Sequence, residues 1–214
     1  MKTDDLIAVL AAETGTAGTW AGLRGTALLA AGGGLGAALL IFALFYGVRP
    51  DLSVALRDPM VACKTLLPAL AALAALPLAL GAARPGAAAP SLAKAALALP
   101  VIGAALVIAA WVQTAPADRM VRFIGHSIPV CVPSIILLSA PVLAGLLAVL
   151  RSGAPDRPAR CGAFAGLAAG SLAAVIYGFY CNEDSPLFYV FWYGTGILAA
   201  TLIGASAGSR LLRW

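Results

Sequence analysis

The chain has 214 residues, of which 62% are hydrophobic and only 11% are charged, and its formal net charge is +5. That is too little polar surface for a water-soluble globule of this length, and the basic residues are scattered between apolar runs instead of forming the stripe typical of nucleic-acid binding. The composition therefore excludes a soluble domain and direct contact with nucleic acid, and it indicates a bilayer as the main solvent.

The first residues are predicted to form a short amphipathic helix ahead of the membrane. Thr3 can cap a helix, the acidic residues that follow suit its positive N-terminal end, and apolar residues continue at helical spacing. A helix lying on the membrane surface is the alternative, but acidic residues suit an anionic inner leaflet poorly. We therefore expect a protein partner to bind this segment, and the residues expected to contact it are Asp4, Asp5, Leu6 and Ile7.

Six apolar runs follow that are long enough to cross about 30 Å of hydrocarbon as helices. They cover residues 25–47, 60–82, 95–112, 128–150, 162–180 and 187–208, and every Asp and Glu lies outside them. We therefore predict an all-α membrane protein with a tail at 1–20 and a six-helix transmembrane domain at 21–214.

The distribution of basic residues predicts the orientation. With the N-terminus in the cytoplasm, nine Lys and Arg residues fall in cytoplasmic segments and four in outer ones. Because positively charged loops are retained on the cytoplasmic side, both termini are predicted to be cytoplasmic. Lys64 is the one charge inside a span and lies within two turns of its start, so we expect it to snorkel to the interface in preference to lining an ion path.

Glycines four residues apart predict where helices approach closely, because small residues let backbones meet in lipid. Packing within the chain is the expected role of these glycines, and a dimer face is the alternative. The glycines concerned are Gly32 with Gly36, then Gly162 with Gly166 and Gly170, then Gly204 with Gly208.

The sequence lacks the residue sets that most catalytic chemistries require. It contains one histidine and no Ser/His/Asp set, HExxH motif, Gly-rich phosphate loop or pair of carboxylates within a span. We therefore predict that the chain is not an enzyme, and the absence of acidic residues from the spans disfavours an ion pump.

Three of the four cysteines gather at one face in the predicted topology. The three near the outer face are Cys63, Cys131 and Cys181, and the fourth, Cys161, lies at the cytoplasmic side. Because the space outside a bacterial inner membrane is oxidising, such thiols can form or exchange disulfides. Thiolates with the nearby His126 can also bind a soft metal ion, although the spacing matches no local metal motif. The alternative is a packing role, since free cysteine behaves as a small apolar residue.

Several stretches along the chain resemble one known family. They are MKTDDLI at 1–7, GVRPDL at 47–52, Cys181 with EDSPLF at 183–188, WYG at 192–194 and RLLRW at 210–214. These stretches resemble the NrsF family, membrane-bound anti-sigma factors that act on extracytoplasmic-function sigma factors in proteobacteria. The resemblance covers essentially the whole chain.

The resemblance implies a six-helix, multi-pass protein of the bacterial inner membrane that holds a sigma factor inactive and releases it under heavy-metal or oxidative stress. The paired sensing cysteines of the family correspond to Cys131 and Cys181, which are also the expected ligands of a transiently bound heavy-metal ion. No resident cofactor is implied. The expected route of the signal is a shift of the fourth and fifth spans, which reaches the inner face through residues 151–160.

Two other classes of function stay open. The first is a small multihelix transporter or channel component whose cysteines are structural. The second is a structural subunit of a larger membrane complex, which only the glycine pattern favours.

Overall fold

The computed structural model describes residues 20–84 and 90–213, and this part of the chain is helical without any β-strand. The all-α class is therefore confirmed. The helices are α2 (Trp20–Phe45), α3 (Leu52–Ala55), α4 (Pro59–Ala82), α5 (Pro90–Ala96), α6 (Ala98–Gln113), α7 (Arg119–Ile124), α8 (Ile128–Leu150), α9 (Pro158–Gly178) and α10 (Pro186–Leu211).

Six segments within the described residues are long and apolar enough to cross a membrane, as predicted. They are Leu28–Phe45, Pro59–Ala82, Lys94–Gln113, Arg119–Leu150, Pro158–Gly178 and Pro186–Leu211. The short helices α3 and α7 lie between the predicted spans, and four and six residues carry too little periodicity to be recognised in the sequence.

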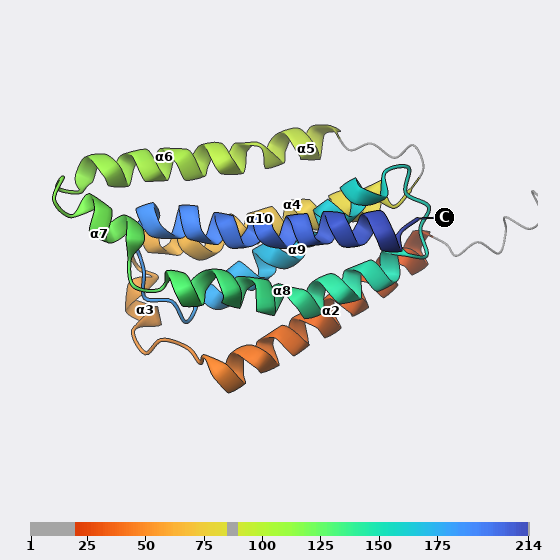
Figure 1. Cartoon of the computed structure of the whole chain (residues 1–214), viewed down its shortest axis with the longest axis horizontal. Helices are drawn as coiled ribbons and strands as arrows, with labels where there is room; N and C mark the ends of the chain where they lie inside the picture. The colour runs from red at the N-terminus through yellow and green to blue at the C-terminus, as the bar shows by residue number, and fades with distance from the viewer. Residues whose placement is uncertain (1–19, 85–89, 214) are drawn as a thin grey trace, which may run out of the picture.

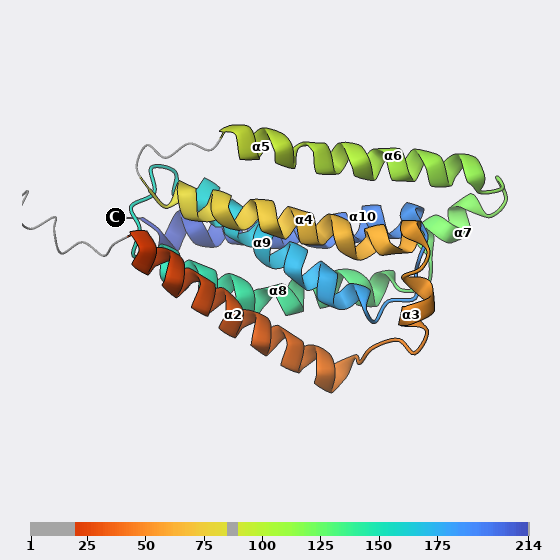
Figure 2. The same ribbon diagram turned by 180° about the vertical axis from the view of Figure 1, so that it is seen from behind.

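The long helices run side by side in one elongated bundle (Figure 1). α9 lies in the middle and packs against α4, α8 and α10, while α2 packs along α8, and α6 lies on the opposite flank beside α10 (Figure 2). The start of α2 and the end of α10 share one end of the bundle, and α3 and α7 lie at the other (Figure 1). That both termini are cytoplasmic stays a prediction.

Local sequence signals explain where several helices begin. Proline is the first residue of α4, α9 and α10, where its fixed φ suits the first turn and its missing N–H is not needed. The side chain of Asp58 also caps α4, because it accepts a hydrogen bond from the Met60 amide at 2.8 Å.

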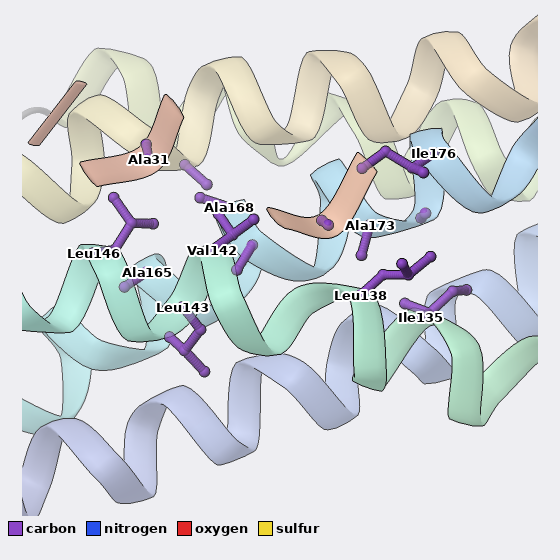
Figure 3. Packing of buried hydrophobic residues seen from close by; sticks show 14 of the residues in the cluster. Ala31, Ile135, Leu138, Val142, Leu143, Leu146, Ala165, Ala168, Ala173 and Ile176 are labelled. Atoms are coloured by element: carbon purple, nitrogen blue, oxygen red, sulfur yellow. The ribbon is translucent and has the colours of Figure 1, made fainter. Parts of the chain in front are cut away.

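The core forms where large side chains of α8 meet small ones of α9 (Figure 3). The buried α8 residues are Ile135, Leu138, Val142, Leu143 and Leu146. They belong to one cluster with Ala165, Ala168, Ala173 and the larger Ile176 of α9 and with Ala31 of α2.

The backbones of α9 and α10 touch directly along a stripe of small residues, as the glycine spacing predicts. A Cβ added to Gly204 would lie 2.8 Å from the Gly166 Cα, and one added to Gly208 would lie 2.7 Å from the Gly162 Cα. No side chain fits between the helices there. We call this contact the glycine seam, and it comprises Gly162, Gly166 and Gly170 of α9 with Ala200, Gly204 and Gly208 of α10.

The predicted packing role of Gly32 and Gly36 within the chain is wrong. Both are exposed, and a Cβ at either would meet nothing within 4 Å in the described structure. α2 instead approaches α8 through Gly34, where a Cβ would lie 2.7 Å from the Pro141 carbonyl oxygen. The spacing correctly indicated a helix rich in small residues, but the face in contact lies between the two predicted positions.

Candidate functional site

The connection between α9 and α10 lies at the end of the bundle that also carries α3 and α7 (Figure 1). α9 ends at Gly178, but the Cys181 amide still donates a helical hydrogen bond to the Tyr177 carbonyl at 3.1 Å. Cys181 therefore follows directly on the last turn of α9. Pro186 begins α10 only five residues later. Loop 181–185 is therefore short and fixed at both ends.

Cys131 and Cys181 are both buried at this end of the bundle. Cys131 is in the first turn of α8 and has no exposed surface, and Cys181 is 2% exposed. Both thiols are free, and they lie near each other. The structure thus brings together the two cysteines expected to sense stress and shields both from solvent.

Two tyrosine hydroxyls share this buried environment. The rings of Tyr177 and Tyr193 are 5.8 Å apart between centroids, and both residues lie near Cys131 and Cys181. The Tyr177 hydroxyl has no hydrogen-bond partner among the described residues, and the Tyr193 hydroxyl lies beside the Cys181 thiol. Most buried hydroxyl groups in proteins form hydrogen bonds. The Tyr177 hydroxyl near the two thiols is therefore available to form one.

Two cations from different helices converge on the backbone of Cys181. Lys64 of α4 donates a hydrogen bond to the Cys181 carbonyl, and Arg49, which follows α2, donates to the same oxygen at 3.2 Å. Both also bind the carboxylate of Asp184: Arg49 at 2.7 and 2.9 Å with its two terminal nitrogens, and Lys64 at 3.0 Å. Arg49 is further paired with Asp51 at 2.8 Å. We call Arg49, Asp51, Lys64 and Asp184 the ion cluster.

The ion cluster shifts the ionisation of its members outside the spans. Hydrogen bonds to Asp51 and Asp184 raise the pKa of Arg49. The hydrogen bond from Arg49 lowers the pKa of Asp51 to about 2. Burial alone would raise the pKa of Asp184, but Arg49 and Lys64 outweigh it and hold that pKa below its usual value. Arg49, Asp51 and Asp184 are therefore charged at neutral pH.

The prediction that Lys64 snorkels to the membrane interface is wrong. Its side chain is enclosed by protein, and its ammonium group binds loop 181–185 instead of water. The apolar neighbours of Lys64 in sequence gave no sign of this, because the groups that bind it follow more than a hundred residues later. A buried ammonium needs such partners, since desolvation without them is costly.

Glu183 anchors the same loop to the start of α8. Its carboxylate accepts a hydrogen bond from the His126 amide at 2.7 Å, while the His126 side chain is 91% exposed with Nδ1 3.8 Å from that carboxylate. The imidazole therefore points away from the buried thiols. Within the described residues no group of three or more His, Cys, Asp or Glu side chains is placed to hold a metal ion, so a metal at Cys131 and Cys181 would have two thiolates as its protein ligands.

The other predicted site residues lie elsewhere. Cys63 is half-buried on α4 and interacts with Tyr189, whereas Cys161 is buried near the opposite end with its thiol 3.5 Å from the Ala79 carbonyl oxygen. The residues expected to bind a protein partner, Asp4, Asp5, Leu6 and Ile7, lie outside the described residues.

Sequence reasoning treated Arg49 only as a topology charge and gave Asp184 no role. A signal was present, however, because Arg49 and Asp51 belong to GVRPDL and Asp184 to EDSPLF, two of the stretches that carry the family resemblance. In the structure these two stretches meet at the ion cluster.

Comparison with known proteins points to one family. The family model described as negative regulator of sigma F, NrsF, matches residues 10–214. The chain is 38% identical over 215 residues to a probable anti-sigma-F factor NrsF of Azospira oryzae and 37% identical over 217 residues to the anti-sigma-F factor NrsF of Caulobacter vibrioides, covering all of each protein in both cases. No solved structure matches the chain.

Proposed function

The chain belongs to the NrsF family of negative regulators of sigma F, and on that premise we propose that it holds an extracytoplasmic-function sigma factor at the bacterial inner membrane and releases it when Cys131 and Cys181 react. The family is regulatory and not catalytic, and its partner is a sigma factor. The six apolar helices suit a multi-pass membrane protein. Nothing in the family supports the transporter alternative.

The observation that carries the sensing proposal is the placement of two free, buried thiols near each other at one end of the bundle, beside charged and hydroxyl groups. Two neighbouring thiols that come into contact can form a disulfide. In that step the S–S bond forms, both S–H bonds break, and two protons and two electrons pass to an oxidant such as hydrogen peroxide, which is reduced to water. Burial means that the structure around the thiols must open before an oxidant reaches them.

A soft metal ion is the second stimulus that this pair suits. Cadmium and similar ions prefer thiolate ligands, and each thiol loses its proton on binding. Cys131 and Cys181 are on different elements, α8 and the loop after α9. Either a disulfide or a bridging metal would therefore draw these two elements together and change the packing around them.

The opposite end of the bundle suits the sigma factor. α2 begins there at Trp20, and exposed basic residues lie at the same end. These are Arg151, Arg157, Arg160, Arg210 and Arg213. We propose that Asp4, Asp5, Leu6 and Ile7 form the main contact and that the basic residues add electrostatic attraction to an acidic region of the partner.

The cysteine proposal is tested by transcription of a sigma-dependent reporter before and after cadmium or peroxide. We expect at least tenfold induction with the wild-type chain and none with the variant Cys131→Ser, Cys181→Ser, which should still repress without stress. The control variant Cys63→Ser, Cys161→Ser removes the two other thiols and should respond normally. Normal induction of the first variant would show that the sensing residues lie elsewhere.

The tail proposal has its own experiment. The variant Asp4→Asn, Asp5→Asn, Leu6→Ser, Ile7→Ser should no longer retain the sigma factor on isolated membranes. Asp118→Asn removes an exposed carboxylate at the opposite end of the bundle and should retain it. Full retention by the tail variant would rule out these four residues as the contact.

A further inference from the structure

Loop 181–185 is tied to the rest of the bundle through groups that do not belong to α9 or α10. Arg49 binds the Cys181 carbonyl and the Asp184 carboxylate, and its own amide donates to the Phe179 carbonyl at 3.0 Å. Lys64 binds the same carbonyl and carboxylate from the first turns of α4. The backbone of the cysteine is therefore held from two directions by buried cations.

The two cations are connected to two different helices, Arg49 to α2 and Lys64 to α4. α2 ends at Phe45, and Gly47, with φ of +78°, turns the chain so that Arg49 reaches the loop. A left-handed φ of this kind is easy only for glycine. Lys64 lies inside α4 itself. A displacement of Cys181 must therefore move Arg49 and Lys64 or break their bonds to it.

We propose that Arg49, Lys64 and Asp184 form a latch that couples the chemical state of Cys181 to the positions of α2 and α4. The inference rests on the proposed sensing function and supplies its transmission step. Drawing the Cys181 thiol into a disulfide or onto a metal ion shifts its carbonyl away from both cations. Little water reaches these groups, so Arg49, Lys64 and Asp184 cannot easily replace lost hydrogen bonds with bonds to solvent. Breaking their contacts with Cys181 therefore favours movement of the segments that carry them.

Helix α2 connects the latch directly with the end of the bundle where the partner is proposed to bind. α2 has 26 residues, so it spans about 39 Å and can transmit a displacement as a rigid rod. Its first turn lies at the end of the bundle opposite α3 and α7. The predicted route to the inner face ran through two spans and residues 151–160. The route from the latch through α2 needs only one helix, which leads directly to the tail.

Hydrogen exchange of the full chain in lipid nanodiscs tests the latch without a sigma factor. The probes are cadmium chloride and diamide, a thiol oxidant, and the observed segment is residues 46–58, which joins α2 to α4. Exchange there should rise at least tenfold in the wild-type protein when its thiols react, and it should stay unchanged in Cys131→Ser, Cys181→Ser. Asp184→Asn should exchange fast without any treatment, even when combined with the two serine substitutions.

The matched control is Glu183→Gln. It changes the neighbouring carboxylate of the same loop, which binds the His126 amide and not the cations, so residues 46–58 should exchange as in the wild type. If Asp184→Asn does not fold, Arg49→Lys keeps the charge but loses the two-pronged geometry, and it should raise exchange about threefold.

Thiols that react in the wild type while residues 46–58 exchange at the same rate would overturn the latch and leave cysteine sensing intact. A chain that shows the exchange change but does not release its sigma factor would overturn the proposed function and leave the latch intact. Thiols that stay unreactive under both treatments would overturn both.

Discussion

The glycine seam and the ion cluster both act on α9 and α10, but through different forces. Along the seam, backbone meets backbone without charged groups, so the contact depends on close packing alone. At loop 181–185 the cohesion comes from opposite charges that are partly shielded from water. Acid, metal ions and oxidants can therefore act on the second region and not on the first. The chain separates a permanent contact from a responsive one within a single helix pair.

The largest effect is expected from a side chain placed in the seam. A Cβ in Gly204→Ala would overlap the Gly162 carbonyl oxygen and lie 2.9 Å from the Gly166 amide nitrogen. Because these neighbours are backbone atoms, they cannot turn aside, and we expect a loss of about 3 kcal/mol or more of unfolding free energy. Unfolding in mixed micelles measures this loss.

Gly36→Ala is the matched control for the seam. Nothing lies within 4 Å of the added methyl in the described structure, so the change in stability should stay within about 0.5 kcal/mol. A large loss at Gly36 would indicate a contact with a second molecule at this exposed face.

The next effect is expected at the ion cluster. Asp184→Asn leaves Arg49 and Lys64, both buried, without their shared counter-charge. Because the Asp184 side chain is 28% exposed and water can screen the change, we expect a loss of about 2 kcal/mol, less than for a fully buried pair. Asp51→Asn removes the other carboxylate bound to Arg49 and, being 58% exposed, should have a much smaller effect. Equal effects of the two variants would contradict the buried role of Asp184.

The seam was largely predictable from the sequence and the ion cluster was not. Glycines four residues apart mark a helix face, and the six spans follow from hydropathy alone, since both signals lie within one segment. The error at Gly32 and Gly36 shows the limit, because spacing does not reveal which face meets a neighbour.

The ion cluster depends on pairs that lie far apart in the chain. Arg49 and Asp184 are separated by 135 positions, and Lys64 and Asp184 by 120. No local pattern connects such groups, so Lys64 looked like an isolated interfacial charge. Cys131 and Cys181 were found only through the family resemblance and the predicted topology, which placed both at one end.

Acid should weaken the ion cluster and leave the seam unchanged. Despite its burial, Asp184 has a pKa held below its usual value by Arg49 and Lys64, and the pKa of Asp51 is about 2. A carboxyl group whose pKa is lower in the folded state adds stability above its unfolded value, about 3.9, and loses it as the pH falls through the folded value. Unfolding free energy should therefore decline between about pH 5 and pH 2.

Variants assign that acid dependence. Asp51→Asn combined with Asp184→Asn should flatten the decline, whereas Gly204→Ala should lower stability at every pH and keep the same slope. A slope that persists in the double carboxyl variant would show that other groups control the acid response.

The smallest effect concerns two hydroxyls near the responsive region, one on each helix. The Tyr189 hydroxyl of α10 donates to the Met60 carbonyl at 2.8 Å, so Tyr189→Phe should cost about 1 kcal/mol. The Tyr177 hydroxyl of α9 is buried without a partner among the described residues, so Tyr177→Phe should be neutral or slightly stabilising. Both are measured by unfolding in mixed micelles. If Tyr177→Phe costs as much as Tyr189→Phe, its hydroxyl binds a water molecule or a thiol, and the surroundings of Cys131 and Cys181 are a satisfied polar network.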